Sequence, residues 1–154
     1  PFQEQQVVKY ALEKGLPVPD MLAFRIQRRG LLYRAASISE FIENQGSLAD
    51  YIGRKTLASD DWKKLGALIK TMHDAGVCHV DLNANNILID HSMDFHLIDF
   101  DKAKLNPAGS NWQLDNLQRL RRSLEKISGL HDEQAKDFHF TDTDWRALLN
   151  GYGD

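Results

Sequence analysis

The chain has 154 residues, a formal net charge of −3 and a single cysteine, Cys78. This length predicts one domain with enough apolar residues for a core, and the small net charge gives no reason to expect a nucleic-acid partner. One cysteine excludes an internal disulfide and fits a reducing compartment. No apolar run approaches the roughly 20 residues that span a bilayer, and no signal-peptide pattern is present. Because the sequence starts at Pro1 directly in a helical pattern, we expect it to be part of a longer protein.

The first third of the chain predicts a helix, a hairpin and two short helical segments. Apolar residues at helical spacing predict a helix over residues 2–14 that stops at Gly15 and leads into an extended, proline-containing segment. We expect strands over 21–26 and 30–35, joined by a turn at 28–30. Helical turns are predicted over 37–44 and 47–54.

Two long helices are predicted in the rest of the chain. Residues 56–75 give the strongest helical pattern, with an apolar face that we expect to support the segment after it. The members of this face are Trp62, Leu65, Leu68, Ile69 and Met72. His73 is predicted to be a hydrogen-bonded structural histidine rather than a ligand. A capping box at Thr141 and Asp144 predicts a last helix.

The second long helix, residues 112–127, combines an apolar side with many basic residues. The apolar side consists of Leu114, Leu117, Leu120 and Leu124, and the basic residues are Arg119, Arg121, Arg122 and Lys126. The basic run favours a solvated helix face. The alternative is an anion-binding surface for acidic lipid head groups or a phosphorylated acceptor, since arginine binds phosphate well.

Residues 79–101 organise the chain. Two short apolar runs, 87–89 and 95–98, flank a polar turn and predict a β-hairpin. Because a hairpin brings its ends together, we expect Asp81, Asn86 and Asp99 to converge. Their oxygen atoms suit Mg²⁺, which takes one or two carboxylates and leaves its other positions to phosphates and water. The competing interpretation is a polar turn whose side chains cap the backbone.

The same stretch contains the H-x-D-L-x-x-x-N pattern and the D-F-x pattern of protein kinases. Asp81 stands at the position of the catalytic base, Asn86 at that of the second metal ligand and Asp99 at that of the main metal ligand. His79 opens the motif, where it is expected to orient the loop rather than transfer protons. These patterns favour a phosphotransfer site over a capped turn.

The sequence resembles the 3-deoxy-D-manno-octulosonic acid (Kdo) kinases of the lipopolysaccharide kinase group, which have a protein-kinase-like fold. The resemblance rests on GLPVP at residues 15–19, HVDLNANNILID at 79–90, FHLIDFDKAKL at 95–105 and NLQRLRRSLEK at 116–126. It implies an enzyme that uses ATP and Mg²⁺ to phosphorylate the 4-hydroxyl of Kdo on a lipid A precursor. It also implies work at the cytoplasmic face of a bacterial inner membrane, in peripheral contact with anionic lipid.

Two residues depart from the protein-kinase pattern. Asp101 replaces the glycine of D-F-G, so an extra carboxylate lies near the metal as a further ligand, a lysine partner or a solvated side chain. Asn83 replaces the lysine that protein kinases often carry after the base, and this catalytic-loop residue fits a sugar acceptor better than a peptide. No A-P-E signature precedes residue 112, so a peptide substrate is not expected.

The expected nucleotide-binding parts are incomplete in this sequence. It contains neither a glycine-rich loop nor a strand lysine. Glu4, with Glu13 second, is the candidate for the glutamate that pairs with such a lysine, whose place would precede Pro1. The adenine is expected near the connection after residues 33–35, at Ala35. A fragment lacking these parts is expected to be weakly active or inactive.

The predicted fold class is therefore α+β: a protein-kinase-like fold, truncated at its N-terminus. Residues 1–36 would be the remainder of the smaller lobe, and residues 37–154 the helical lobe with the catalytic loop and metal-binding hairpin. The alternatives are another small-molecule kinase of this fold, such as an aminoglycoside or choline-type phosphotransferase, and a non-catalytic kinase-like binding module. The sequence does not determine the oligomeric state.

Overall fold

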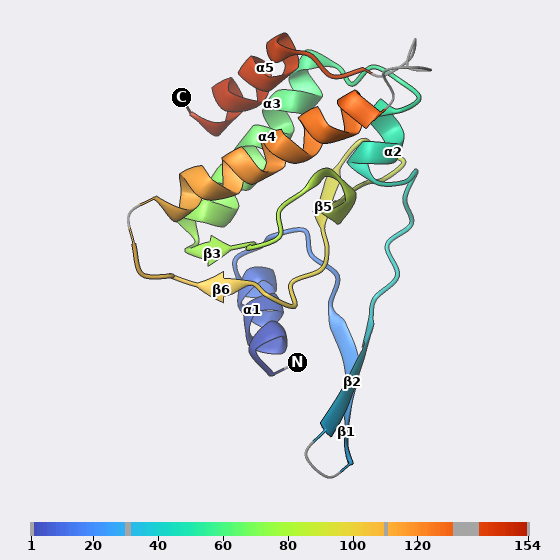
Figure 1. Ribbon diagram of the computed structural model, residues 1–154, viewed down its shortest axis with the longest axis vertical. Coiled ribbons are helices and arrows are strands. Elements are labelled where there is room, and N and C mark those ends of the chain that lie inside the picture. The colour runs from blue at the N-terminus through green and yellow to red at the C-terminus, as the bar shows by residue number, and fades with distance from the viewer. Residues whose placement is uncertain (1, 30–31, 110, 131–138, 154) are drawn as a thin grey trace.

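The structure is a computed structural model that describes residues 2–29, 32–109, 111–130 and 139–153. Figure 1 shows α3, α4 and α5 gathered at one end of the molecule and the β1–β2 hairpin projecting at the other, with α1 beside the base of this hairpin. The elements are α1 (Phe2–Glu13), β1 (Met21–Arg29), β2 (Leu32–Ser39), α2 (Leu48–Ile52), α3 (Ser59–Asp74), β3 (Val77–Cys78), the 3-10 helix η1 (Ala84–Asn86), β4 (Ile87–Ile89), β5 (Phe95–Leu97), β6 (Lys104–Leu105), α4 (Trp112–Leu130) and α5 (Asp142–Tyr152).

The first helix and the segment after it form as predicted. α1 buries Val7, Val8 and Ala11, and the chain reverses after it at Gly15, whose φ of 73° is the left-handed conformation that glycine adopts without strain. The following extended segment is tied to the hairpin over residues 87–97, because the backbone N–H of Leu97 donates to the carbonyl of Pro17 at 2.9 Å.

The β1–β2 hairpin is longer than predicted. β1 and β2 pair antiparallel, with Ile26 opposite Ala35 and Ala23 opposite Ile38. The predicted turn includes Gly30, which lies outside the described residues. The prediction of helical turns over 37–44 is wrong, because β2 continues to Ser39 and no helix follows until α2. Ile38 and Phe41 are 63% and 82% exposed, so this segment has no apolar face turned toward the core.

α3 is the centre of the helical part and packs most extensively against α5 (Figure 1). Its predicted apolar face is confirmed, since Trp62, Leu65, Ile69 and Met72 are fully buried and Leu68 packs at the edge of the core. Two glycines allow the close approach of the helices. A Cβ on Gly66 would lie 1.9 Å from the carbonyl oxygen of Leu148, and one on Gly151 would lie 2.0 Å from that of Lys63.

The predicted central hairpin is also confirmed. β4 pairs antiparallel with β5, with Ile87 opposite Leu97 and Ile89 opposite Phe95, and all four side chains are buried. The short pairing of β3 with β6 was not predicted. It holds the chain on either side of the hairpin together, so that the loop before β4 and the loop after β5 lie close to each other.

The last two predicted helices are present, with one correction. α5 begins with the predicted capping box, in which the hydroxyl of Thr141 accepts from the N–H of Asp144 and the carboxylate of Asp144 accepts from the N–H of Thr141. In α4, Leu117, Leu120 and Leu124 are buried as expected. Leu114 is 53% exposed, so the predicted apolar side is one turn shorter than the sequence pattern indicated.

Candidate active site

The segment between β3 and β4 is held in place by His79. This side chain is 1% exposed, its Nε2 lies 2.8 Å from the carbonyl oxygen of Ile98, and its ring centroid lies 4.7 Å from that of Phe100. Because a carbonyl oxygen only accepts, Nε2 carries the hydrogen. Burial lowers the pKa of His79, so the ring is neutral near pH 7. His79 therefore links the loop before β4 to the end of β5, which agrees with the orienting role that the motif predicts.

The Asp81 backbone is fixed by two asparagine side chains. Its carbonyl oxygen accepts from Nδ2 of Asn83 at 2.9 Å and from Nδ2 of Asn86 at 3.0 Å. The Oδ1 of Asn83 in turn accepts from the N–H groups of Asn85 and Asn86 and caps η1. Both ends of the Asn83 side chain are thus used within the loop, which assigns this residue to shaping the loop.

Asn86 and Asp99 meet where the two strands of the hairpin end. The N–H of Ile98 donates to the carbonyl of Asn86 at 3.0 Å, which places Asp99 directly after the residue that faces Asn86. Asp99 has a φ of 64°, a conformation uncommon outside glycine but tolerated by aspartate. Phe100 is buried, whereas Asp99 and Asp101 on either side of it are exposed. The structure thus brings Asp81, Asn86 and Asp99 to one end of the hairpin.

Arg119 of α4 is a site residue that the sequence pattern did not single out. Its Nε donates to Oδ1 of Asp81 at 3.0 Å, and its Nη2 donates to the same oxygen. This guanidinium is the main reason why the pKa of Asp81 lies below its ordinary value. α4 is docked on the loop by a second contact, in which the N–H of Ala84 donates to Oγ of Ser123 at 3.1 Å. The spacing of the basic residues was visible in the sequence, but not which of them faces Asp81.

α1 brings Glu4 toward the Asp99–Asp101 segment. Nε2 of Gln3 donates to the carbonyl of Ala103 at 3.2 Å, which anchors the start of the helix there. Burial raises the pKa of Glu4, and the neighbouring carboxylates of Asp101 and Asp99 raise it further. Glu13, the second candidate, is exposed at the far end of α1.

Ala35, the residue expected near the adenine, lies inside β2 opposite Ile26. Its side chain is outside the described residues. The strand continues for four residues beyond it, so the connection to α2 begins at Glu40 rather than after Ala35.

A buried network of polar side chains connects α5, α3 and α4 to β3, directly before the loop that begins at His79. The hydroxyl of Tyr152 in α5 lies 2.8 Å from Nδ1 of His73, and Oδ1 of Asn116 lies 3.4 Å from Nε2 of the same histidine. The Nδ2 of Asn116 donates to Sγ of Cys78, next to His79. Burial lowers the pKa of His73 to about 4, so the ring is neutral, with Nε2–H donating to Asn116 and Nδ1 accepting from Tyr152. His73 is the structural histidine that the sequence predicted.

The oxygen atoms at the hairpin mouth fit a hard divalent cation bound together with phosphates. Asn86 uses its Nδ2 toward Asp81, which leaves Oδ1 for a cation. The carboxylate of Asp99 makes no hydrogen bond or ion pair within the described part of the chain. No group of three or more His, Cys, Asp or Glu residues among those described could hold a metal alone. Two protein ligands completed by phosphate oxygens and water is the arrangement that Mg²⁺ favours.

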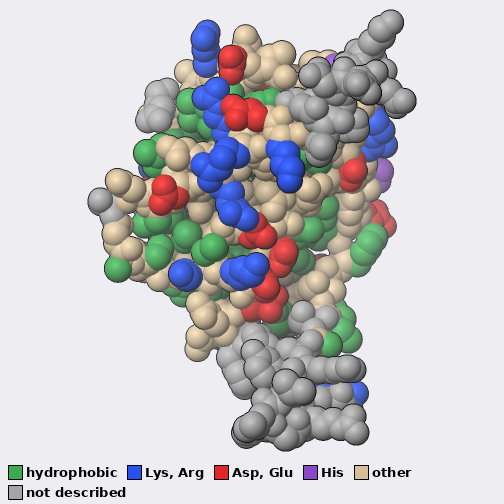
Figure 2. Space-filling view, viewed as in Figure 1, with side chains coloured by type: hydrophobic (Ala, Val, Ile, Leu, Met, Phe, Trp, Pro, Cys, Tyr) green, Lys and Arg blue, Asp and Glu red, His purple; other side chains and the backbone are tan. Residues whose placement is uncertain are grey.

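Figure 2 shows the face of the molecule that carries this site. Lys and Arg side chains gather over α4, and Asp and Glu side chains are grouped next to them. Within α4, Arg121 is committed to Glu125 at 2.7 Å and to Asp142 at 3.2 Å, whereas Arg119 turns toward Asp81. The basic helix is therefore not a uniformly solvated face.

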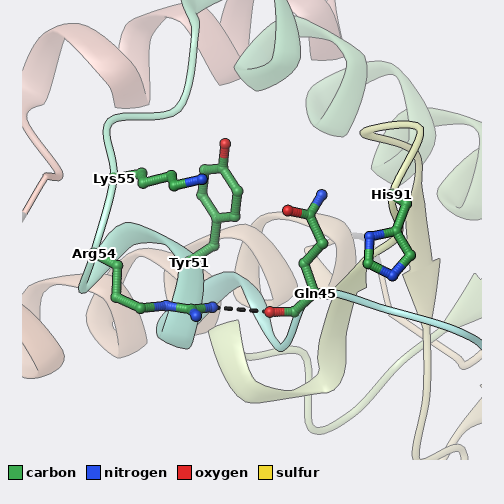
Figure 3. A pocket seen from close by; sticks show the side chains of 5 residues that line it. All are labelled: Gln45, Tyr51, Arg54, Lys55 and His91. Carbon is green, nitrogen blue, oxygen red and sulfur yellow. Dashed lines mark hydrogen bonds between the residues drawn. The ribbon is translucent and has the colours of Figure 1, made fainter.

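A separate cavity of about 240 Å³ lies at the opposite end of the β4–β5 hairpin, lined by Gln45, Tyr51, Arg54, Lys55 and His91. Figure 3 shows Nη2 of Arg54 donating to the backbone carbonyl of Gln45, at 2.8 Å, with Lys55 over the ring of Tyr51. None of the described residues that line this cavity is a carboxylate. Because His91 lies in the turn of the hairpin and Asp99 at its other end, the cavity is distinct from the candidate active site.

The fold and the site together define a protein-kinase-like chain. A solved structure titled as the Cydia pomonella granulovirus kinase PK-1 superposes with a TM-score of 0.51 and 15% identity, covering 68% of this chain and 39% of that one. This likeness supports the kinase-like α+β fold predicted from the sequence.

The chain belongs to the lipopolysaccharide kinase (Kdo/WaaP) family, whose model matches residues 1–152. It is 38% identical to a 3-deoxy-D-manno-octulosonic acid kinase of Haemophilus influenzae (strain PittEE), 37% to that of Mannheimia succiniciproducens and 38% to that of Vibrio vulnificus (strain CMCP6). These alignments cover 98% of this chain and 61–62% of the relatives' length. The predicted family is confirmed.

Proposed function

We propose that the protein containing this chain is an ATP-dependent kinase that phosphorylates the 4-hydroxyl of Kdo on a lipid A precursor. The single observation that carries the proposal is the convergence of Asp81, Asn86 and Asp99 at one end of the β4–β5 hairpin, in a chain of this family. The acceptor is taken from the relatives, which are named as kinases of this sugar acid.

In the proposed reaction the oxygen of the sugar hydroxyl attacks the γ-phosphorus of ATP, and ADP departs. Asp81 accepts the proton that this hydroxyl loses. The ion pair with Arg119 keeps Asp81 ionised and leaves its other oxygen, Oδ2, for the hydroxyl. Asn86 and Asp99 would hold Mg²⁺, which when bound neutralises charge on the phosphates. Asp101, at the edge of the same group of carboxylates, is proposed as a weaker contributor because it lies beyond the buried Phe100, whereas Asp99 directly follows the residue that faces Asn86.

In the kinase pattern, the helix glutamate pairs with a lysine that also contacts the phosphates of the nucleotide, and Glu4 is the candidate for this glutamate. Burial and the proximity of Asp101 and Asp99 raise the pKa of Glu4, so a cation beside this carboxylate would stabilise its ionised form. We propose that this lysine lies in the part of the protein not covered by this sequence. The adenine would then be bound along the connection from β2 to α2, residues 40–47, rather than at Ala35 itself.

We also propose that the protein works at the cytoplasmic face of the inner membrane, because its acceptor is a lipid. None of the helices among the described residues is long and apolar enough to cross a bilayer. The cavity of Figure 3, with Arg54 and Lys55, is a site where an anionic head group would fit. Cosedimentation with anionic vesicles tests this contact. We expect an Arg54→Gln, Lys55→Gln double variant to bind the vesicles at least about threefold more weakly than the parent.

The experiment for the acceptor is phosphate transfer from Mg·ATP by the full-length protein to three acceptors assayed in parallel. These are a Kdo-bearing lipid A precursor, an aminoglycoside and choline. Transfer to the Kdo acceptor alone is the expected result. Transfer to either of the others would assign the chain to another small-molecule kinase of the same fold, and ATP binding without transfer to any acceptor would favour a binding module.

A further inference from the structure

Arg119 holds the proposed catalytic base with only part of its guanidinium. Nε and Nη2 both donate to Oδ1 of Asp81. Arginine has five N–H donors in a planar fork. Nη1 makes no hydrogen bond with any described residue, and the side chain is 48% exposed. One edge of the fork is therefore bound to Asp81, and donors on the other edge remain available to a ligand beside Asp81.

The proposed acceptor creates an electrostatic problem at this position. An octulosonic acid carries a carboxylate at C1, and its reacting hydroxyl is on the same sugar, so the carboxylate must approach Asp81 when the hydroxyl contacts it. Asp99 and Asp101, both exposed on either side of the buried Phe100, add to the negative charge at this end of the hairpin. Carboxylates that lie this close together repel one another strongly unless a cation lies between them.

We infer that Arg119 is a specificity-determining residue that bridges Asp81 and the carboxylate of the sugar acid. The inference rests on the proposed function and adds to it the group that distinguishes an acid acceptor from a neutral one. Arginine suits this position, because its planar fork binds carboxylates with defined geometry and stays charged.

The neighbouring cations fit this role less well. Arg121 is engaged by Glu125 and Asp142, and its guanidinium lies 5.7 Å from the centre of the Trp145 ring. Lys102 acts on Asp81 only through its charge, without a direct hydrogen bond. Arg122, one turn beyond Arg119 on α4, has no described contact with Asp81, and so provides a matched control of the same charge on the same helix.

The test compares two acceptors in the full-length protein: a Kdo-bearing lipid A precursor and the same molecule with the Kdo carboxylate converted to the primary amide. The parent should prefer the acid by at least about tenfold in kcat/KM. In Arg119→Gln this preference should fall to within about threefold, with most of the change in KM for the acid. Arg119→Lys should retain part of the preference, and Arg122→Gln all of it.

Thermal unfolding and ATP binding by each variant establish that the comparison is made on folded proteins. A parent preference that survives in Arg119→Gln would overturn the inference while leaving the proposed function intact. A parent that phosphorylates acid and amide equally would do the same. A folded, ATP-binding parent that phosphorylates neither would overturn the proposed function and the inference together.

Discussion

Asp81 and Arg119 form the ion pair on which the account of the site depends. The guanidinium lowers the pKa of Asp81, so the carboxylate stays ionised well below neutral pH. If Asp81 is the base, the rate should fall on acidification as it becomes protonated. In Arg119→Gln the pKa should rise toward its ordinary value, and the acid limb of the kcat/KM profile should move to higher pH. An acid limb that stays where it is in the parent would show that another group controls it.

Asp99 and Asp101 differ in what surrounds them, although only Phe100 separates them. Asp99 follows the residue that faces Asn86, whereas Asp101 lies beyond the buried Phe100. Asp99→Asn should therefore raise the Mg²⁺ concentration needed for ATP binding about tenfold or more, and Asp101→Asn by less than about threefold. Titration calorimetry of ATP binding at several Mg²⁺ concentrations measures both. Equal effects would make Asp101 a full ligand.

His73 gives the folded protein a pH dependence of its own. Its pKa falls from an ordinary value of 6.5 to about 4 on burial, so the folded state binds fewer protons than the unfolded state between these values. Stability from this group is therefore complete above about pH 6.5 and is lost as the pH falls toward 4, by about 3 kcal/mol in all.

Urea unfolding between pH 4 and 7 measures this effect, and His73→Gln supplies the comparison, since an amide does not titrate in this range. The variant should lose the part of the pH dependence that His73 contributes, whatever its stability at pH 7. Parallel curves for the two proteins would contradict the assignment of a neutral buried imidazole.

At the scale of elements, α3 and α5 pack so closely that their contact requires glycine. Gly66→Ala would place a Cβ against the backbone of Leu148, where no side-chain rearrangement relieves the clash. Helix propensity alone favours alanine by up to about 1 kcal/mol, but overpacking costs about 1–3 kcal/mol. We expect net destabilisation in thermal unfolding. Gly53→Ala is a matched control, because its Cβ would lie no closer than 3.3 Å to another atom. Equal stability of the two variants would show that α3 and α5 can separate at little cost.

The elements also show where sequence patterns succeed and where they fail. The hairpin and the long helices were predictable because their apolar periodicity matches the faces that are buried, as with Ile87, Ile89 and Leu97. The prediction of helical turns over residues 37–44 was wrong because the apolar residues of this segment, Ile38 and Phe41, are exposed and do not face the core. Backbone pairing to β1 decides the conformation of residues 37–39, and that pairing leaves no periodic signal.

At the scale of the whole molecule, the candidate active site combines three parts of the chain that are distant in sequence. The loop at 79–86 and the turn at 99–101 could be predicted together because one hairpin connects them. Arg119 and Glu4 reach the site from α4 and α1, so their contacts follow from helix packing. For the same reason the network of His73, Asn116 and Tyr152 could not be read from spacing. These contacts are where the structure adds most to the sequence.

The central claim is that Asp81 is the base of a phosphotransfer site, and the most direct measurement is its replacement by asparagine in the full-length protein. Phosphate transfer from Mg·ATP to a Kdo-bearing lipid A precursor should fall about 10²–10⁴-fold in Asp81→Asn, with ATP binding retained. Asp94→Asn, an exposed carboxylate at the other end of the same hairpin, should transfer at the parental rate. Parental transfer by folded Asp81→Asn would contradict the account.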